Sequence, residues 1–170
     1  MFASLRGREK TVKFISDFVE RFGIKIEFDE ENVVEKENRY FLLNDRLKGL
    51  IADDFFYAGV YLGMVKSDVF LPSVNLLKII AKNEKANKVF VDERSAWLFI
   101  CGRDLFKRGI TKIEGSRKKG DYTLILNRYG ECLGFGIILK DLDAVEKGVV
   151  VKNVLDIGDF LRRERKRLEE

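Results

Sequence analysis

The chain has 170 residues, 46% of them hydrophobic, which suffices for the core of one domain or of two small ones and argues against disorder. It contains no histidine, the commonest general base and the usual partner of a catalytic nucleophile, and no Gly-x-x-x-x-Gly-Lys-Ser/Thr loop for nucleotide phosphates. No segment approaches the roughly 20 apolar residues of a membrane span, and the first residues lack the apolar core of a signal peptide. We therefore expect a cytoplasmic protein that is not an enzyme and that uses no cofactor and no metal.

The first half of the chain predicts a helix followed by a meander of strands. Apolar side chains recur at helical spacing through residues 5–22, and Gly23 is a typical C-terminal stop. Short apolar segments between polar turns predict strands at residues 24–28, 33–34, 40–43, 60–65 and 69–71. Ser73 is the expected cap of a second helix, which carries Leu76, Leu77, Ile79 and Ile80.

The second half predicts a small β-rich domain. Residues 83–88 are polar and contain no β-branched or aromatic side chain, so we place the domain boundary there. A short strand at residues 89–91 precedes a helix over 93–100, in which Ala96, Trp97 and Ile100 share one face and after which Gly102 supplies the stop. Later apolar segments at residues 122–126, 133–139 and 149–151 are separated by short turns, a spacing that is typical of a small barrel or sandwich. Residues 157–168 form a final, strongly basic segment.

Basic side chains concentrate in this second half. Residues 1–87 carry 14 basic and 14 acidic side chains, whereas residues 88–170 carry 18 and 14. Seven of the basic residues lie between Arg103 and Lys119, and five more lie within residues 162–167. Each phosphate that such residues neutralise releases counterions, so the distribution favours a polyanionic partner. The alternative is an ordinary solvated surface that keeps the protein soluble.

Three further features are interpreted as structural. Gly134-Phe135-Gly136 lies within an apolar segment and not between a strand and a helix, so we expect a strand bend or a close backbone approach and not a dinucleotide-binding loop. Asp53-Asp54 precede aromatic residues and are expected to cap a helix and favour its dipole, in preference to binding a metal. Cys101 and Cys132 are expected to be buried apolar residues, with a single bridge between them as the alternative.

The order of glycines in the second half resembles the signature of the PUA domain, a module named after pseudouridine synthases and archaeosine transglycosylases. The resemblance covers about residues 88–165 and rests on residues 102–110, Lys119-Gly120-Asp121-Tyr122 and Gly134-Phe135-Gly136. It implies a small β-barrel in which RNA lies against the first helix, the following strand and the last strand, here residues 102–110 and the segment after Val149. A glycine there lets a sugar-phosphate backbone approach, and flanking Arg and Lys supply charged hydrogen bonds.

The whole chain is similar to the Nip-seven family of ribosome-biogenesis proteins, in its archaeal branch. Residues 153–164 resemble the closing motif of that family, and Asn44-Asp45-Arg46 after a strand is compatible with it. The resemblance implies that the PUA half binds RNA, that the first domain makes protein contacts, and that the last strand ends beside the glycine-bearing first helix. The chain departs from the eukaryotic members in its longer and more basic end after Arg162.

We therefore expect an α+β protein. Residues 1–85 form an N-terminal α/β domain with an antiparallel sheet and helices, residues 88–165 form a PUA-type small β-barrel, and residues 166–170 form a charged tail. The expected function is RNA binding without catalysis in large ribosomal subunit assembly and pre-rRNA processing. Single-stranded rRNA, with uridine-rich segments as one candidate, and other assembly or RNA-processing proteins are the expected partners, and a membrane is not. The alternatives are a PUA accessory protein of translation or RNA modification, and a protein adaptor with a merely solvating basic end.

The expected RNA-binding residues come from two segments that the resemblance brings together. They are Gly102, Arg103, Lys107, Arg108, Gly109, Arg162, Arg163, Arg165, Lys166 and Arg167. Gly102 and Gly109 are expected to shape the surface. Arg162, Arg163 and Lys166 are expected to contribute binding without stabilising the fold.

Overall fold

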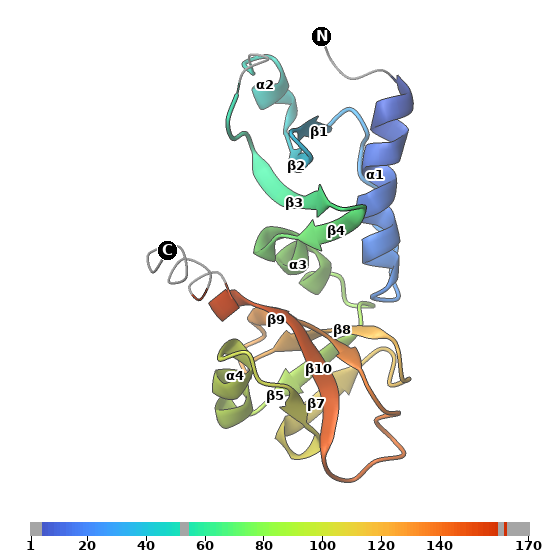
Figure 1. Cartoon of the computed structure of the whole chain (residues 1–170), viewed down its shortest axis with the longest axis vertical. Coiled ribbons are helices and arrows are strands. Elements are labelled where there is room, and N and C mark those ends of the chain that lie inside the picture. The colour runs from blue at the N-terminus through green and yellow to red at the C-terminus, as the bar shows by residue number, and fades with distance from the viewer. Residues whose placement is uncertain (1–4, 52–54, 160–161, 163–170) are drawn as a thin grey trace. The chain divides into compact units, whose positions relative to one another are not determined.

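The computed structural model describes residues 5–51, 55–159 and 162, with side chains from residue 12 onward, and divides the chain into two compact units (Figure 1). The first unit comprises the residues up to Glu20 together with Ile24–Ile79. The second comprises the residues from Ile80 onward and the short segment Arg21–Gly23. None of the helices in the described ranges combines the length and the apolar character needed to cross a membrane.

The first unit is an antiparallel sheet with helices, as the sequence predicts. Its helices are α1 (Leu5–Glu20), α2 (Asp45–Lys48) and α3 (Val74–Ala81), the last shared with the second unit, and its strands are β1 (Val33–Lys36), β2 (Arg39–Leu42), β3 (Val60–Lys66) and β4 (Val69–Pro72). The sheet order is β1-β2-β3-β4, and each neighbouring pair is antiparallel. Buried side chains of α1 pack on this sheet, with the ring of Phe18 centred 5.5 Å from that of Phe70. Ser73 caps α3 as expected, because its hydroxyl accepts the Leu76 N–H at 3.1 Å.

The two hairpins of this sheet have two-residue turns. Glu37 and Asn38 have φ of 52° and 61°, and Ser67 and Asp68 have φ of 49° and 60°. A positive φ at both central residues is the geometry of a type I′ turn, whose twist matches that of the flanking strands. These polar pairs therefore set the register of β1 on β2 and of β3 on β4.

Two expectations for the first unit are wrong. Residues 24–28 form no strand, because their backbone pairs with neither sheet. Their side chains do alternate between more buried and exposed positions, which explains the pattern in the sequence. Residues 55–59 form no helix, because the rings of Phe55 and Tyr57 pack edge-on against Phe41, at centroid distances of 5.7 and 5.3 Å, and the chain follows them as a loop. Asp53 and Asp54 lie outside the described residues.

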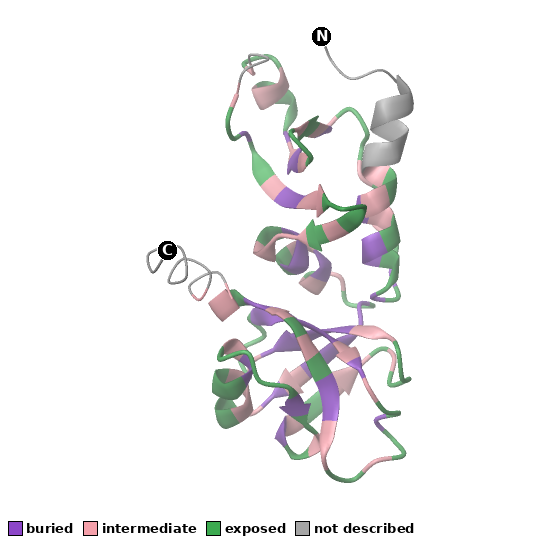
Figure 2. Cartoon of the chain, viewed as in Figure 1, coloured by how far each residue is buried: buried purple, intermediate pink, exposed green. Residues whose placement is uncertain are grey.

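The second unit is a curled six-stranded sheet with helix α4 beside it, and the described residues 157–159 after β10 are also helical. Its elements are β5 (Lys88–Val91), α4 (Glu93–Ile100), β6 (Leu105–Phe106), a 3-10 turn (Lys107–Gly109), β7 (Ile110–Glu114), β8 (Tyr122–Leu126), β9 (Cys132–Ile138) and β10 (Val149–Asp156). The strand order is β6-β10-β9-β8-β5-β7, with β5 and β8 parallel and the other pairs antiparallel. Figure 2 shows buried residues along β8 and β9 and an exposed outer side of α4. The core is apolar and contains Val89, Val91, Phe99, Leu105, Ile125, Leu133, Ile138, Leu142, Val150 and Val151. The fold class predicted from the sequence is confirmed.

Gly134 and Gly136 allow β10 to lie close against β9. A Cβ on Gly134 would be 2.0 Å from the carbonyl oxygen of Leu155, and one on Gly136 would be 2.4 Å from that of Lys152. Gly134 also has a φ of +149°, which a side chain disfavours. The expected close backbone approach is therefore confirmed. The register of the pair shifts between Asn153 and Leu155, an irregularity of the kind that bends a strand.

The segment in which we place the domain boundary ends in the core of the second unit. Asn87 is buried, and its side chain donates to the carbonyl of Tyr122 at 3.1 Å and accepts the Ser116 N–H at 2.8 Å. Its own N–H donates to the carbonyl of Phe22 at 2.9 Å. The ring of Phe22 is fully buried, with its centroid 5.7 Å from those of both Tyr122 and Phe135. Residues 21–23 therefore belong to the second unit, a return of the chain that the linear pattern does not indicate.

Candidate nucleic-acid interface

The C-terminal end of α4 carries the glycine that the sequence singles out. Gly102 has a φ of +86°, and its N–H donates to the carbonyl of Phe99 at 2.9 Å, while the N–H of Arg103 donates to that of Leu98 at 3.1 Å. This is the Schellman arrangement, which favours glycine at the left-handed position. At the other end of the helix, Asp92 accepts the Ser95 N–H at 2.7 Å. The side chain of Asp92 and Gly102 thus define both ends of α4.

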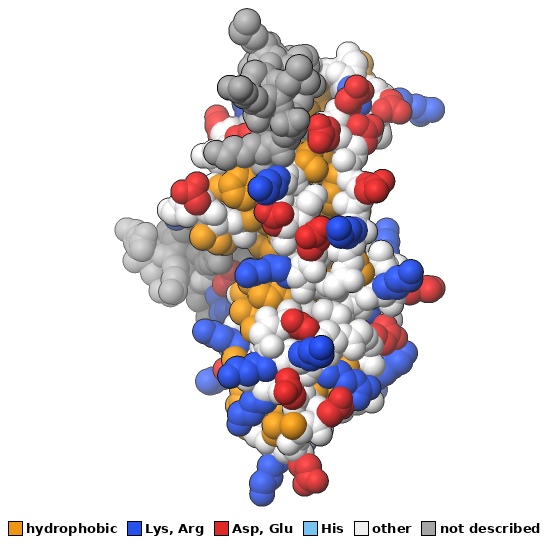
Figure 3. All heavy atoms as spheres, turned by 90° about the vertical axis from the view of Figure 1, so that its right-hand side faces the viewer, with side chains coloured by type: hydrophobic (Ala, Val, Ile, Leu, Met, Phe, Trp, Pro, Cys, Tyr) orange, Lys and Arg blue, Asp and Glu red, His pale blue; other side chains and the backbone are white. Residues whose placement is uncertain are grey.

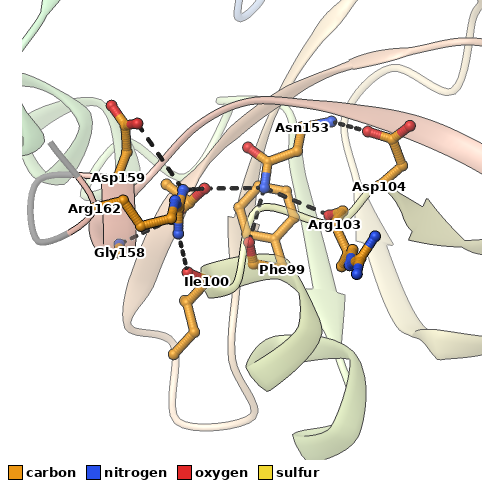
Figure 4. Close-up of polar contacts among 9 residues, drawn as sticks. Phe99, Ile100, Arg103, Asp104, Asn153, Gly158, Asp159 and Arg162 are labelled. Atoms are coloured by element: carbon orange, nitrogen blue, oxygen red, sulfur yellow. Dashed lines mark hydrogen bonds and ion pairs between the residues drawn. The ribbon is translucent and has the colours of Figure 1, made fainter. Parts of the chain in front are cut away.

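Asn153 of β10 ties this helix end to the last strand. Its backbone N–H donates to the carboxylate of Asp104 at 2.9 Å, and its side-chain amide donates to the carbonyl of Phe99 at 2.8 Å (Figure 4). The same amide nitrogen lies 3.1 Å from the carboxylate of Asp156. One residue therefore joins the last strand, the helix terminus and the loop after it.

Asp156 and Arg162 extend the network into the segment after β10. The carboxylate of Asp156 is buried and accepts the Gly158 N–H at 2.8 Å and a guanidinium N–H of Arg162 at 2.7 Å. A second guanidinium nitrogen donates to the carbonyl of Ile100 at 2.6 Å (Figure 4). The hydrogen bond to Asp156 raises the pKa of Arg162 further above its ordinary value, with the Coulombic attraction of Asp156 and Asp159 adding to it, so the guanidinium stays charged.

These contacts bring together the two segments that were expected to form the site. The guanidinium carbon of Arg162 lies 3.4 Å from the position that a Cβ on Gly102 would occupy. The expected proximity of the last strand's end to the glycine-bearing helix end is therefore confirmed. Arg162 also donates hydrogen bonds to a buried carboxylate and to a helix-terminal carbonyl. These contacts speak against the expectation that Arg162 does not stabilise the fold.

Two of the expected cations remain on the surface near this network. Arg103 is exposed, and Figure 4 shows its guanidinium apart from the hydrogen bonds around Asn153. Arg108 is exposed as well, with its guanidinium carbon 5.6 Å from the centre of the Phe106 ring. Arg108 borders a hollow of about 260 Å³ beside α4, which Arg94 and the half-exposed ring of Phe106 also line. At such a place the cations can bind a phosphate, and the exposed ring can stack on a base.

Two other expected residues serve the packing of the unit. The ammonium of Lys107 donates to the carbonyl of Leu142, so this cation is engaged within the protein. Gly109 is buried, and a Cβ there would be 1.9 Å from the hydroxyl oxygen of Ser95. This packing assigns Gly109 a structural role and gives no support to its expected place on an RNA surface, because the atoms nearest to it belong to Ser95 of α4.

The remaining basic residues differ in how far their charge is compensated. Lys112 lies 2.7 Å from Glu114, and Arg117 lies 2.7 Å from Asp143. Figure 3 shows acidic side chains interspersed among the basic ones over the second unit on the face that it presents. Four of the expected contacts, Arg163, Arg165, Lys166 and Arg167, lie outside the described residues.

Neither Cys101 nor Cys132 forms a disulfide, and the two lie in different surroundings. Cys132 is buried, as expected, but Cys101 is exposed, because it is the C-cap of α4 at the surface. Sequence reasoning also missed Asp104 and Arg94 as parts of this region. The closing motif does contain Asn153 and Asp156, and an asparagine and an aspartate at the end of an apolar strand could have indicated a hydrogen-bond network.

Comparison with known proteins identifies the fold of this region. Residues 87–165 match the family described as the UPF0113 PUA domain. The second unit has a PUA-type fold. This confirms the resemblance of residues 88–165 to PUA domains. A UPF0113 protein of Archaeoglobus fulgidus is 31% identical over 115 residues, 64% of this chain and 63% of the relative, so the match spans less than two thirds of the relative's length.

Solved structures resemble the chain over nearly its whole length. A conserved PUA domain protein from Thermoplasma acidophilum has a TM-score of 0.62 at 24% identity, covering 96% of this chain and 97% of that one. A PUA domain from Aeropyrum pernix, crystallised with tartrate, has a TM-score of 0.62 at 20% identity and covers 98% of this chain and 90% of that one. At these identities the likeness establishes the fold.

Proposed function

We propose that this protein binds single-stranded RNA through its second unit and catalyses no reaction. The observation that carries the proposal is the network of Asn153, Asp156 and Arg162, which fixes the end of β10 beside the glycine end of α4. Exposed Arg103 and Arg108 flank this place, and the resemblance to PUA domains implies that RNA lies against this surface. The basic surplus of residues 88–170 adds long-range attraction for a polyanion.

The biological setting that we propose is assembly of the large ribosomal subunit in the cytoplasm. Its support is the resemblance of residues 153–164 to the closing motif of the Nip-seven family. In this setting the RNA is rRNA, and the first unit binds other assembly proteins. Leu50, Phe56 and Tyr57 favour such contacts, because they leave 81%, 78% and 56% of their surfaces exposed.

The test is the salt dependence of RNA binding by the full-length chain. Binding of a fluorescent single-stranded RNA should weaken steeply and linearly on a plot of log affinity against log salt, because each phosphate contact releases counterions. A protein adaptor should bind RNA weakly and without a steep slope, which would overturn the proposal. Crosslinking in cells followed by sequencing should recover rRNA of the large subunit, and recovery of other RNAs alone would favour an accessory role in translation or RNA modification.

A further inference from the structure

A second hollow lies on the opposite flank of α4, between the helix and the turn from β8 to β9. It has a volume of about 700 Å³, and Ala96, Ile100 and Leu133 form an apolar floor. The indole of Trp97 borders it, and 64% of this residue's surface is exposed. One face of α4 therefore carries Ala96, Trp97 and Ile100, as the sequence predicts. At Trp97 this face is exposed to solvent. An exposed tryptophan over an apolar floor is a typical contact for a flat ligand.

The turn beside this hollow is held by hydrogen bonds to its own asparagine and carries a second exposed ring. The side chain of Asn127 accepts the N–H groups of Tyr129 and Glu131 at 2.9 and 3.0 Å. Tyr129 is 71% exposed, and the guanidinium carbon of Arg128 lies 4.7 Å from its ring centre. Arg128 also lies 3.5 Å from the carboxylate of Glu93 on α4, which ties the turn to the helix. The hollow is therefore open before any ligand binds.

Arg94 connects the two flanks of α4. It lines both this hollow and the smaller one that contains Phe106 and Arg108. Its guanidinium is exposed and forms no ion pair with any residue in the described part of the chain, whereas Glu93 is paired with Arg128. The uncompensated charge at this hollow is therefore positive, which favours an anionic ligand over a basic or neutral one.

We propose that the hollow holds one unpaired base of the bound RNA, stacked on Trp97, while Arg94 contacts the adjoining phosphate. The inference rests on the proposed RNA-binding function and deepens it. The strand crosses α4 from the surface of Arg103 and Arg108 to the far flank of the helix. Exposed aromatic rings next to arginines are the arrangement with which proteins hold single-stranded nucleic acid, because every base has a face that can stack. A duplex end cannot supply such a base without unpairing.

The chain offers a direct readout, since Trp97 is its only tryptophan. The full-length protein is titrated with a fluorescently labelled single-stranded RNA of ten uridines, and RNA anisotropy and tryptophan emission are followed in parallel. Stacking should quench the emission with the same midpoint as the anisotropy change. An RNA of equal length with abasic nucleotides keeps the phosphates and lacks the bases, so it should bind without this quenching.

Variants separate the base contact from the phosphate contacts. Trp97→Ala should weaken binding roughly 5- to 100-fold, the usual effect of losing one base–aromatic stack, and should leave the salt slope unchanged. Trp97→Phe should restore most of the affinity, because a ring remains. Arg94→Ala should instead lower the salt slope by about 0.7. Val69→Ala, which trims an exposed apolar side chain of the first unit, is the control and should leave RNA affinity unchanged.

The outcomes distinguish this inference from the function on which it rests. An RNA that binds by anisotropy without changing the emission of Trp97, or equal quenching by the abasic RNA, would overturn the inference and leave RNA binding intact. The hollow would then be open to a protein partner. Absence of any anisotropy change would overturn the proposed function itself. Equal affinity of Trp97→Ala and the unchanged protein would also contradict the stack, whatever the melting temperature of the variant.

Discussion

The carboxylate of Asp156 and the guanidinium of Arg162 lie 2.7 Å apart, and only one of the two side chains reaches solvent, with exposures of 2% and 41%. A buried carboxylate is stable only when its oxygens accept hydrogen bonds. The oxygens of Asp156 accept them from the backbone N–H of Gly158, the side-chain amide of Asn153 and the guanidinium of Arg162. The same guanidinium bonds to the carbonyl of Ile100 at the end of α4. One arginine therefore closes the helix end and compensates the buried charge.

Replacing Arg162 with alanine should lower the free energy of unfolding by about 1–3 kcal/mol, because it removes hydrogen bonds to a buried charge. Since the guanidinium is partly exposed, solvent can replace some of them, and the lower part of that range is expected. Arg162→Lys should recover only part of the loss, because a lysine lacks the planar fork that reaches two acceptors. Thermal or denaturant unfolding measures the effect.

Asp159 supplies the matched control for this prediction. It lies 4.0 Å from Arg162 and is more exposed than Asp156, so Asp159→Asn should change stability by less than about 0.5 kcal/mol. An Arg162→Ala protein as stable as the unchanged one would show that the network does not support the fold, and Arg162 would then return to the set of free RNA contacts.

Gly109→Ala should destabilise the second unit by about 1–3 kcal/mol, as overpacking in a filled interior does. The new methyl group would meet the hydroxyl oxygen of Ser95 at 1.9 Å and its Cβ at 2.7 Å. Adding Ser95→Gly removes both atoms and should restore part of the stability. The recovery is incomplete, because a glycine within a helix itself costs roughly 0.5–1 kcal/mol. The four proteins of this double-mutant cycle are compared by denaturant unfolding.

RNA affinity completes the test of Gly109. Under conditions in which Gly109→Ala is folded, its affinity for single-stranded RNA should equal that of the unchanged protein. A loss of affinity at unchanged stability would mean that Gly109 does border the RNA after all.

How far the sequence predicts this fold depends on whether a residue's partner is near in the chain. Helix ends and hairpins were predictable, because Ser73 and Gly102 act on atoms within a few residues of themselves. The sequence indicated that Gly109 is a required glycine. It could not indicate which residue approaches Gly109, because Ser95 lies on the preceding helix. Asn87 looks like a linker residue until Tyr122 and Ser116 provide its hydrogen bonds.

The candidate site divides in the same way. The glycine order and the closing motif predicted that residues 102–110 and the segment after β10 would meet, and they do. Charge alone could not predict which cations remain available, because Lys107 and Arg117 are engaged by Leu142 and Asp143, neighbours that only the fold brings near. The hollow beside Trp97 likewise depends on where the β8–β9 turn lies against α4.

Stability should also depend on pH through Glu114. A hydrogen bond from Lys112 lowers the pKa of Glu114, and the nearby charge of Lys88 adds to this effect. A pKa that is lower in the folded than in the unfolded chain stabilises the fold above the ordinary glutamate value, and this contribution is lost as the pH falls through the folded value. The difference in free energy of unfolding between the unchanged protein and Glu114→Gln should be about 1 kcal/mol at neutral pH. It should shrink in the acidic range, and a difference independent of pH would contradict the ion pairing.

The last prediction concerns which exposed cations bind RNA. Arg103→Ala combined with Arg108→Ala removes two charges beside the Asn153 network, and Lys118→Ala combined with Lys119→Ala removes two exposed charges from the loop between β7 and β8. The two double variants have the same net charge, so a difference between them does not come from net charge. The arginine pair should lower the slope of log affinity against log salt by about 1.4, since each contact to a single strand contributes about 0.7. It should weaken binding of all single-stranded sequences alike, because phosphates carry no sequence. The lysine pair should change the affinity only slightly, through the weaker long-range field. Equal losses from both pairs would mean that RNA binding follows net charge alone, and the surface between α4 and β10 would not be the site.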